Sequence, residues 1–128
     1  MESPITFKGY KINSISYETS KDNQIDLTEE YKPDISFGVD SNFEMGTVQI
    51  NSVLNTIERQ LTINISGFFE LNKNYTEDEE EIMSYLGVNG SAILLPYVRA
   101  IVSVLTTLDS NQAIVLPTIN VVELLNNQ

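Results

Sequence analysis

One stretch of the sequence decides the fold: Ile93-Leu-Leu-Pro-Tyr-Val-Arg-Ala-Ile-Val-Ser-Val-Leu-Thr-Thr-Leu108. It contains a single charged residue, Arg99, in a chain that is otherwise strongly acidic. A helix that spans a membrane needs about 20 consecutive apolar residues, whereas this stretch is shorter, contains Arg99 and Pro96, and is flanked by polar turns. We therefore expect no membrane insertion and infer that protein covers these side chains.

Placed on a helix from about Ser91 to Leu108, this stretch is apolar on more than one side. One stripe at helical spacing is expected to cover a sheet, and it comprises Leu94, Tyr97, Val98, Ile101, Leu105 and Leu108. Other apolar residues lie off that stripe, namely Ile93, Ala100, Val102 and Val104. One sheet cannot cover both sides, so we expect the C-terminal segment and another copy of the chain to share the second side. The predicted interface between copies comprises Ile93, Tyr97, Ala100, Ile101, Val104 and Leu105.

The first part of the chain, residues 1–71, carries the two-residue periodicity of β-strands. A long strand is expected over Ile5–Glu18, with an irregularity near Gly9 because the apolar residues change phase there. Three further strands are expected over Asp34–Phe43, from Val48 to Leu54 and from Leu61 to Leu71, with turns at Met45-Gly46 and around Glu58–Gln60. Short reversals between the last three strands predict an antiparallel sheet of four strands.

The second part, residues 76–128, changes to helical periodicity. Thr76 and Glu79 form a predicted capping box for a short helix that ends at Gly87. After the long helix, Ala113–Leu116 is expected to be extended, and Asn120 is expected to cap a last helix through Leu125. The sequence thus predicts one α+β domain over residues 1–128, with the helices packed on one face of the sheet.

Composition excludes several classes of function. The chain has no cysteine and no histidine, which removes thiolate chemistry, the usual zinc ligand sets and every histidine-based triad. Its net charge of −11 disfavours nucleic acid as a partner and favours basic, unfolded chains, although solubility alone also explains it. The acids Glu77 to Glu81 lie where a helix dipole favours them, so we predict no enzyme activity, no metal and no cofactor. The N-terminus lacks the pattern of a secretory signal, and we expect a cytoplasmic protein.

Two motifs resemble the SecB family of protein-export chaperones. The first is Leu86-Gly-Val-Asn-Gly-Ser-Ala-Ile-Leu-Leu-Pro-Tyr-Val-Arg99, in which Pro96, Tyr97 and Arg99 match the family's helix. The second spans residues 116–122, where Pro117 and Asn120 match a later element. Weaker similarities are Ser66-Gly-Phe-Phe-Glu-Leu71 and Tyr31-Lys-Pro33. The resemblance implies a four-stranded antiparallel sheet with helices on one face, and a homotetramer built as a dimer of dimers.

The resemblance also implies a function. Members of the family are holdases: they bind unfolded polypeptides in grooves, catalyse no reaction and serve protein export through a translocase motor. The candidate peptide-binding residues here lie near the junction of the last strand and the short helix, and they are Phe68, Phe69, Tyr75, Met83, Tyr85 and Leu86. For each of them, packing in the core or in a subunit interface is the alternative.

The outer face of the predicted sheet departs from the family pattern. Gln60 and Thr62 occupy the positions of the family's motor-docking Leu-x-Glu pattern, and Ser14 replaces a first-strand acid where Glu18 keeps another. Two alternatives to an export chaperone therefore stand: a chaperone dedicated to one client of a toxin–antitoxin system, or a structural or regulatory oligomer that binds one folded partner. Arg99 is expected to pair with a buried or interfacial partner such as Glu70 or Glu123, the alternative being a carboxylate of a client.

Overall fold

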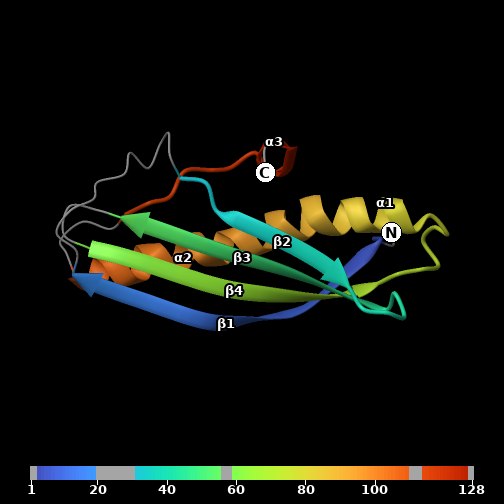
Figure 1. Cartoon of the computed structure of the whole chain (residues 1–128), viewed down its shortest axis with the longest axis horizontal. Coiled ribbons are helices and arrows are strands. Elements are labelled where there is room, and N and C mark those ends of the chain that lie inside the picture. Colours follow the sequence, from blue (N-terminus) through green and yellow to red (C-terminus); the bar gives the residue numbers. More distant parts are fainter. Residues whose placement is uncertain (1–2, 20–30, 56–58, 110–113, 127–128) are drawn as a thin grey trace.

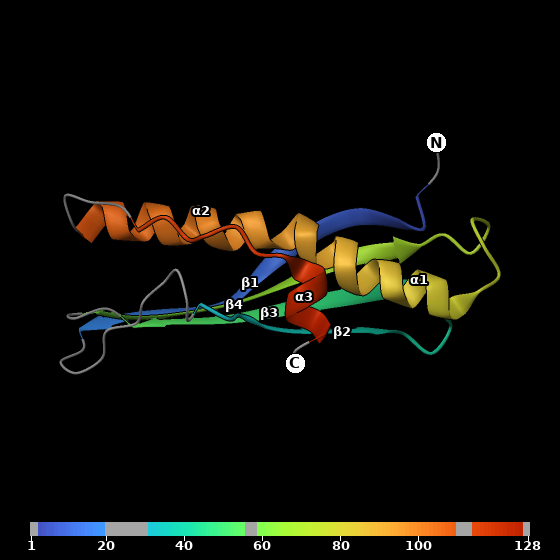
Figure 2. The ribbon, with the colours of Figure 1, turned by 90° about the horizontal axis from the view of Figure 1, so that it is seen from above.

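The computed structural model describes residues 3–19, 31–55, 59–109 and 114–126. Its four strands are β1 (Ile5–Thr19), β2 (Asp34–Val39), β3 (Met45–Asn55) and β4 (Arg59–Leu71). They form one antiparallel sheet in the order β1-β4-β3-β2, so the first two strands of the chain lie at opposite edges. The helical elements are α1 (Glu79–Tyr85), the π-helical segment η1 (Leu86–Gly90), α2 (Ser91–Asp109) and α3 (Val121–Asn126). The helices lie on one face of the sheet (Figures 1 and 2), which confirms the predicted α+β fold.

Two irregularities in β1 keep its apolar side chains on the helix side of the sheet. The pairing of β1 with β4 shifts between Phe7 and Gly9 and again between Ile12 and Ser14. Gly9 has a φ of 137°, a conformation that glycine adopts far more readily than other residues. The irregularity predicted at Gly9 is therefore confirmed, and the second shift matches the return of Ile15 and Tyr17 to the phase of the first apolar residues. Together they place six apolar or aromatic residues of β1 on the helix side of the sheet, where they pair with the residues of β4 that face the helices. These six are Ile5, Phe7, Tyr10, Ile12, Ile15 and Tyr17.

The reversal between β2 and β3 is longer than the sequence indicates. β2 ends at Val39, and β3 already begins at Met45, so the predicted turn at Met45-Gly46 is wrong. Asp40 holds the reversal, because its Oδ1 accepts hydrogen bonds from the backbone N–H groups of Glu44 (2.7 Å) and Met45 (3.2 Å). These bonds favour the charged carboxylate and lower the pKa of Asp40.

The start of α1 also differs from the prediction. The cap is Asp78, whose carboxylate accepts hydrogen bonds from the backbone N–H groups of Glu80 and Glu81 at 3.0 Å and 3.4 Å. Thr76 instead accepts one from the backbone N–H of Asp78 at 3.1 Å. The predicted capping box is therefore wrong, because a carboxylate two residues beyond Thr76 takes its place.

Gly87 does not end a helix. α1 continues through η1 into α2. The glycines of η1 instead allow this helical segment to lie close to the sheet. A Cβ atom on Gly87 would lie 2.6 Å from the Phe37 ring, and one on Gly90 would lie 2.9 Å from Val48. The later prediction for α3 is confirmed, since Asn120 Oδ1 accepts a hydrogen bond from the backbone N–H of Glu123 at 3.1 Å.

The side of α2 that faces the sheet differs in part from the predicted stripe. Its buried residues are Ser91, Leu94, Leu95, Val98, Val102 and Thr106. Val102 is fully buried although it was placed on the other side, whereas Leu108, which was placed on the sheet, is 79% exposed. The hydroxyls of Ser91 and Thr106 bond to the carbonyls of Gly87 and Val102, one turn back. Two polar residues can therefore face the sheet, which a search for apolar positions alone does not find.

The helical rod Glu79–Asp109 is 31 residues long, and by length and composition it could cross a membrane. The stretch from Ile93 to Leu108 alone is too short, but the rod as a whole is not. The core helix of a soluble protein passes the same test. The sheet covers one side of this helical segment, where Leu94 and Val98 are fully buried. Only 33% of the apolar 18-residue stretch that is long enough to cross a membrane is buried, however. The remaining apolar surface of α2 therefore needs another explanation.

Candidate functional site: an apolar face and a groove beside α3

One apolar surface extends over the helix side of β1 and over the side of α2 that carries Tyr97. We call it the β1–α2 face. Its exposed members are Tyr10, Ile12, Ile15, Ile93, Val104 and Leu108, and its half-buried members are Tyr97, Ile101 and Leu105. Val104 is 59% exposed, although valine is a residue that folded proteins usually bury. No described part of the chain covers this face.

Aromatic contacts connect the β1–α2 face to the core. The ring of Tyr97 stacks on Tyr10, with 4.2 Å between ring centroids, and packs against Phe7 at 6.1 Å. Phe7 in turn contacts the fully buried Phe69 at 5.3 Å. This chain of ring contacts joins β1 to α2, so the two elements form one continuous surface.

The six residues predicted for the interface between copies all lie on this exposed side or at its border. Ile93, Ala100 and Val104 are exposed, and Tyr97, Ile101 and Leu105 are half-buried. The structure therefore leaves all six available to a partner, and the assembly itself stays a prediction.

The six residues predicted to bind peptide do not form one groove. Phe69 and Leu86 are fully buried in the core, which corrects their assignment: Leu86 packs where Gly46 leaves space, and Phe69 packs against Phe7. Phe68 is half-buried and, by the alternation of β4, faces the opposite side of the sheet. Met83 and Tyr85 are half-buried, and Tyr75 is exposed in the segment before α1. Of the six, these last three stay accessible on the helix side or the loop that leads to it.

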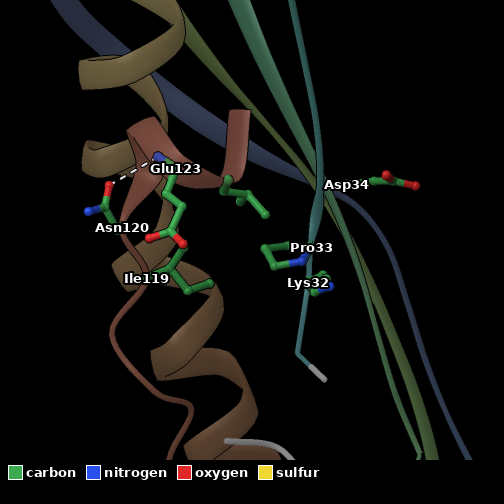
Figure 3. Close-up of a pocket in the computed structure, with 7 residues that line it drawn as sticks. Lys32, Pro33, Asp34, Ile119, Asn120 and Glu123 are labelled. Atoms are coloured by element: carbon green, nitrogen blue, oxygen red, sulfur yellow. Dashed lines mark hydrogen bonds between the residues drawn. The ribbon is translucent and has the colours of Figure 1, made fainter. Parts of the chain in front are cut away.

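A groove that the sequence did not predict lies between α3 and the start of β2. Its volume is about 410 Å³, and its walls come from Lys32, Pro33, Asp34, Ile119, Asn120, Glu123 and Leu124. Figure 3 shows Ile119 and Glu123 on one side and Pro33 on the other. Beyond Ile119 lies a smaller pocket of about 200 Å³ against α2, lined by Tyr31, Ala92, Leu95, Pro96, Arg99, Pro117, Thr118, Ile119 and Val121. The one signal in the sequence for these two cavities was the pair of proline-containing segments, Tyr31–Pro33 and residues 116–122.

Arg99 lies in the wall of the smaller pocket without the ion pair that we expected. Its Nε atom is buried and has no hydrogen-bond partner. Neither Glu70 nor Glu123 lies within salt-bridge distance of it, and Arg59–Asp109 is the ion pair that the described residues form. Within one chain the pairing of Arg99 with Glu70 or Glu123 is therefore wrong, because Glu70 lies on the outer face of the sheet and Glu123 lines the neighbouring groove. A partner of Arg99 across an interface between copies stays a prediction.

The far end of α2 is fastened to the sheet by a polar cluster. Asp109 Oδ2 accepts hydrogen bonds from Arg59 Nε at 2.6 Å and from the Tyr17 hydroxyl at 2.9 Å. The bond from Arg59, followed by the bond from Tyr17, lowers the pKa of Asp109. Burial and the neighbouring carboxylate raise the pKa of Tyr17. The geometry of this cluster fits a role in holding α2 in place.

The outer face of the sheet carries a network of neutral amide side chains. Asn64 is at its centre: its Oδ1 accepts hydrogen bonds from Asn13 at 2.8 Å and Gln49 at 2.9 Å, and its Nδ2 donates to Asn51 at 3.1 Å. Gln60 and Thr62 lie on the same face, by the alternation of β4. Within the described ranges, no group of three or more acidic residues is arranged to hold a metal ion.

The four-stranded antiparallel sheet with its helices on one face is the fold of a SecB-like chaperone. Among solved structures, the chain is similar to the Mycobacterium tuberculosis Rv1957 SecB-like chaperone, in complex with a ChAD peptide from the Rv1956 HigA1 antitoxin. That likeness has a TM-score of 0.70 and 19% sequence identity, and it covers 91% of this chain and 88% of the other. The resemblance to SecB-like proteins is thus confirmed at the level of the fold.

Two other similar proteins have no assigned function. A protein of unknown function from Streptococcus agalactiae is similar with a TM-score of 0.56 and 15% identity, over 89% of this chain and 97% of the other. A segment of 67 residues is 34% identical to the uncharacterized protein MJ0357 of Methanocaldococcus jannaschii. It covers 52% of this chain and 41% of that protein, so the chain spans less than half the length of the curated relative it matches. No model of a protein family matches the chain.

Proposed function

We propose that the chain is a SecB-like molecular chaperone, a holdase that binds non-native polypeptides as a homo-oligomer and catalyses no reaction. The observation that carries the proposal is the apolar surface that the fold leaves uncovered, on the β1–α2 face and in the groove beside α3. Exposed apolar patches of this kind mark surfaces for protein partners. The fold it shares with the Rv1957 chaperone supports the same assignment, since that protein was solved with a bound peptide.

The two surfaces serve different partners in this proposal. The β1–α2 face is broad and continuous with the core, which suits a permanent contact with a second copy. Two such pairs then form the homotetramer, a dimer of dimers. A lipid bilayer is the alternative to a second copy as the cover for α2. A flotation assay with liposomes distinguishes them, because a protein whose α2 is covered by a second copy does not float with the liposomes.

The groove beside α3 receives the client. It has apolar and polar walls, and it opens beside β2, which is an edge strand of the sheet. An extended segment can place alternate side chains in such a groove. The exposed Tyr75 and the half-buried Met83 and Tyr85 add further contacts near α1, because thioether and aromatic groups tolerate varied apolar sequences.

One observation favours a dedicated client over general protein export. The outer face carries Gln60, Thr62 and an amide network where docking of a translocase motor calls for acidic side chains. The peptide in the Rv1957 complex comes from an antitoxin. A client from a toxin–antitoxin system, met in the cytoplasm, therefore fits these features better than a translocase motor does.

The proposal is tested by aggregation of chemically unfolded substrates. Several unrelated proteins, diluted from denaturant, are followed by light scattering with and without the chain at substoichiometric oligomer. Suppressed aggregation of all of them supports a general holdase, and suppression of one antitoxin alone supports a dedicated chaperone. If no unfolded substrate is held, the remaining function is a structural or regulatory oligomer with a folded partner.

A further inference from the structure

The pocket around Arg99 carries a charge that nothing in the described chain neutralises. Its walls are mainly apolar, with Tyr31, Leu95, Pro96, Pro117 and Ile119 among them. A guanidinium donates five hydrogen bonds and stays protonated at any ordinary pH. A buried donor without a partner is costly, so most such donors are paired in native proteins. The unpaired, buried Nε of Arg99 is therefore a site for an acceptor that the described part of the chain does not supply.

We infer that this pocket receives the carboxylate of an aspartate or glutamate side chain in a bound, extended peptide, and so sets a preference among clients. The inference rests on the proposed function and names the chemistry that the groove selects. Carboxylates pair with guanidinium groups through two parallel hydrogen bonds, which explains why this anion fits an arginine better than a neutral amide does.

The size of the pocket favours one side chain. Its volume of about 200 Å³ is below the range of about 300 to 1,000 Å³ that whole small-molecule ligands occupy. A glutamate has an apolar stem that can lie against Leu95, Pro96 and Ile119 while its carboxylate meets Arg99. A chain terminus fits less well, because its last peptide N–H would enter the apolar pocket together with the carboxylate.

The larger groove explains how the rest of the peptide is placed. Ile119 lines both cavities, so a segment with its acid at Arg99 continues past Ile119 toward Lys32 and Pro33. Glu123 and Asp34 also line that groove, so further acids are disfavoured there and a neutral or basic residue is favoured. The expected client motif is one acidic residue, followed or preceded by apolar residues and then by a basic one.

The net charge of the chain predicts how the binding of an acidic peptide depends on salt. The chain has a net charge of −11 and therefore repels an acidic peptide at long range. Salt screens exposed charges over about 8 to 10 Å at physiological strength but affects buried pairs much less. The preference for an acid at the pocket should therefore persist at 0.5 M salt, when contacts made only on the surface have weakened.

The test uses the full chain and a set of labelled, extended peptides that share one neutral, apolar sequence. One peptide has a single central glutamate, a second has glutamine at that place, and a third has glutamine with a free C-terminal carboxylate instead of an amide. Fluorescence anisotropy gives each Kd. We expect the glutamate peptide to bind the wild-type chain about tenfold more tightly than the glutamine peptide, as a charge-assisted hydrogen bond predicts. Arg99→Gln should remove that difference, and Arg99→Lys should keep part of it.

The matched control is Lys11→Gln, which removes one positive charge from the exposed outer side of β1. It should keep the tenfold preference. Equal binding of the glutamate and glutamine peptides by the wild-type chain overturns the inference and leaves the proposed function intact. Tighter binding of the free C-terminus overturns it in favour of a terminal carboxylate. If no peptide binds, both proposals fail, and a change of oligomeric mass in Arg99→Gln then places Arg99 in an interface between copies.

Discussion

The ring of Tyr97 on α2 stacks on the ring of Tyr10 on β1, with centroids 4.2 Å apart and planes inclined by 29°. This contact joins an edge strand to the long helix at the surface of the molecule. The exposed apolar side chains on either side of it therefore form one continuous face, and a partner that covers α2 covers β1 as well.

Replacing Val104 by aspartate should break the proposed oligomer. Val104 is 59% exposed at the middle of the β1–α2 face, so a charge there would be desolvated without a partner when a second copy binds. Light scattering should show the wild-type chain as an oligomer and Val104→Asp as a monomer of 14.4 kDa. The control is Val53→Asp, since Val53 is 43% exposed but lies on the outer side of β3. An oligomer that survives Val104→Asp and dissociates with Val53→Asp would place the interface on the outer face.

Adding a methyl group at Gly46 should destabilise the sheet–helix packing. A Cβ atom there would lie 2.6 Å from Cδ2 of Leu86, which is fully buried and cannot move aside freely. We expect Gly46→Ala to lower the free energy of unfolding by about 1–3 kcal/mol, the usual cost of overpacking. Urea denaturation at a fixed protein concentration measures it.

The companion variant is Gly38→Ala, at a strand glycine with open space where its Cβ would stand. It should be neutral or gain about 0.4–1 kcal/mol, because alanine restricts the unfolded chain. Equal losses in both variants would mean that the contact with Leu86 is unimportant and that each strand simply prefers glycine.

Much of the fold was predictable because periodicity records which side of an element is buried. The strands β1 and β4, the limits of α2 and the cap at Asn120 all follow from local patterns. The continuity of α1, η1 and α2 was not predictable in this way. Gly87 and Gly90 have the local signature of a helix end, and only their contacts with Phe37 and Val48 on the distant sheet explain them as packing residues.

The candidate site was harder to predict than the fold. Phe69 and Leu86 belong to residue types that bind peptides and that also fill cores, and composition does not separate these roles. The groove beside α3 is built from segments far apart in the chain, around Pro33 and Ile119. No local pattern predicts which side chains line such a cavity. The apolar excess of α2 was visible in the sequence because it is a property of one continuous element.

Replacing Asp109 by asparagine should destabilise the chain at neutral pH and have less effect in acid. The bonds from Arg59 and Tyr17 lower the pKa of Asp109 in the folded protein relative to the unfolded one. A lowered pKa contributes stability that is present above the unfolded value of about 3.9, and that is lost as the pH falls through the folded value. Urea midpoints of wild type and Asp109→Asn should therefore differ at pH 7 and converge below pH 4.

Glu18→Gln serves as the reference for this pH series, because it removes an exposed carboxylate from the strand that carries Tyr17. Its difference from wild type should change less between pH 7 and pH 3 than that of Asp109→Asn. A constant difference for Asp109→Asn over the whole range would show that the cluster acts through shape and not through charge.

The buried contact between Tyr31 and Ser52 should show strong coupling in a double-mutant cycle. The two hydroxyl oxygens are 3.0 Å apart, Ser52 is fully buried, and Tyr31 is 9% exposed. Tyr31→Phe leaves the serine hydroxyl without this partner, and Ser52→Ala does the same to the tyrosine, so each should cost about 1–3 kcal/mol. In the double variant neither hydroxyl remains, and the loss should be smaller than the sum of the single losses by about 0.5–3 kcal/mol. Urea denaturation of the four proteins measures the cycle, and strictly additive losses would show that the hydroxyls find other partners once separated.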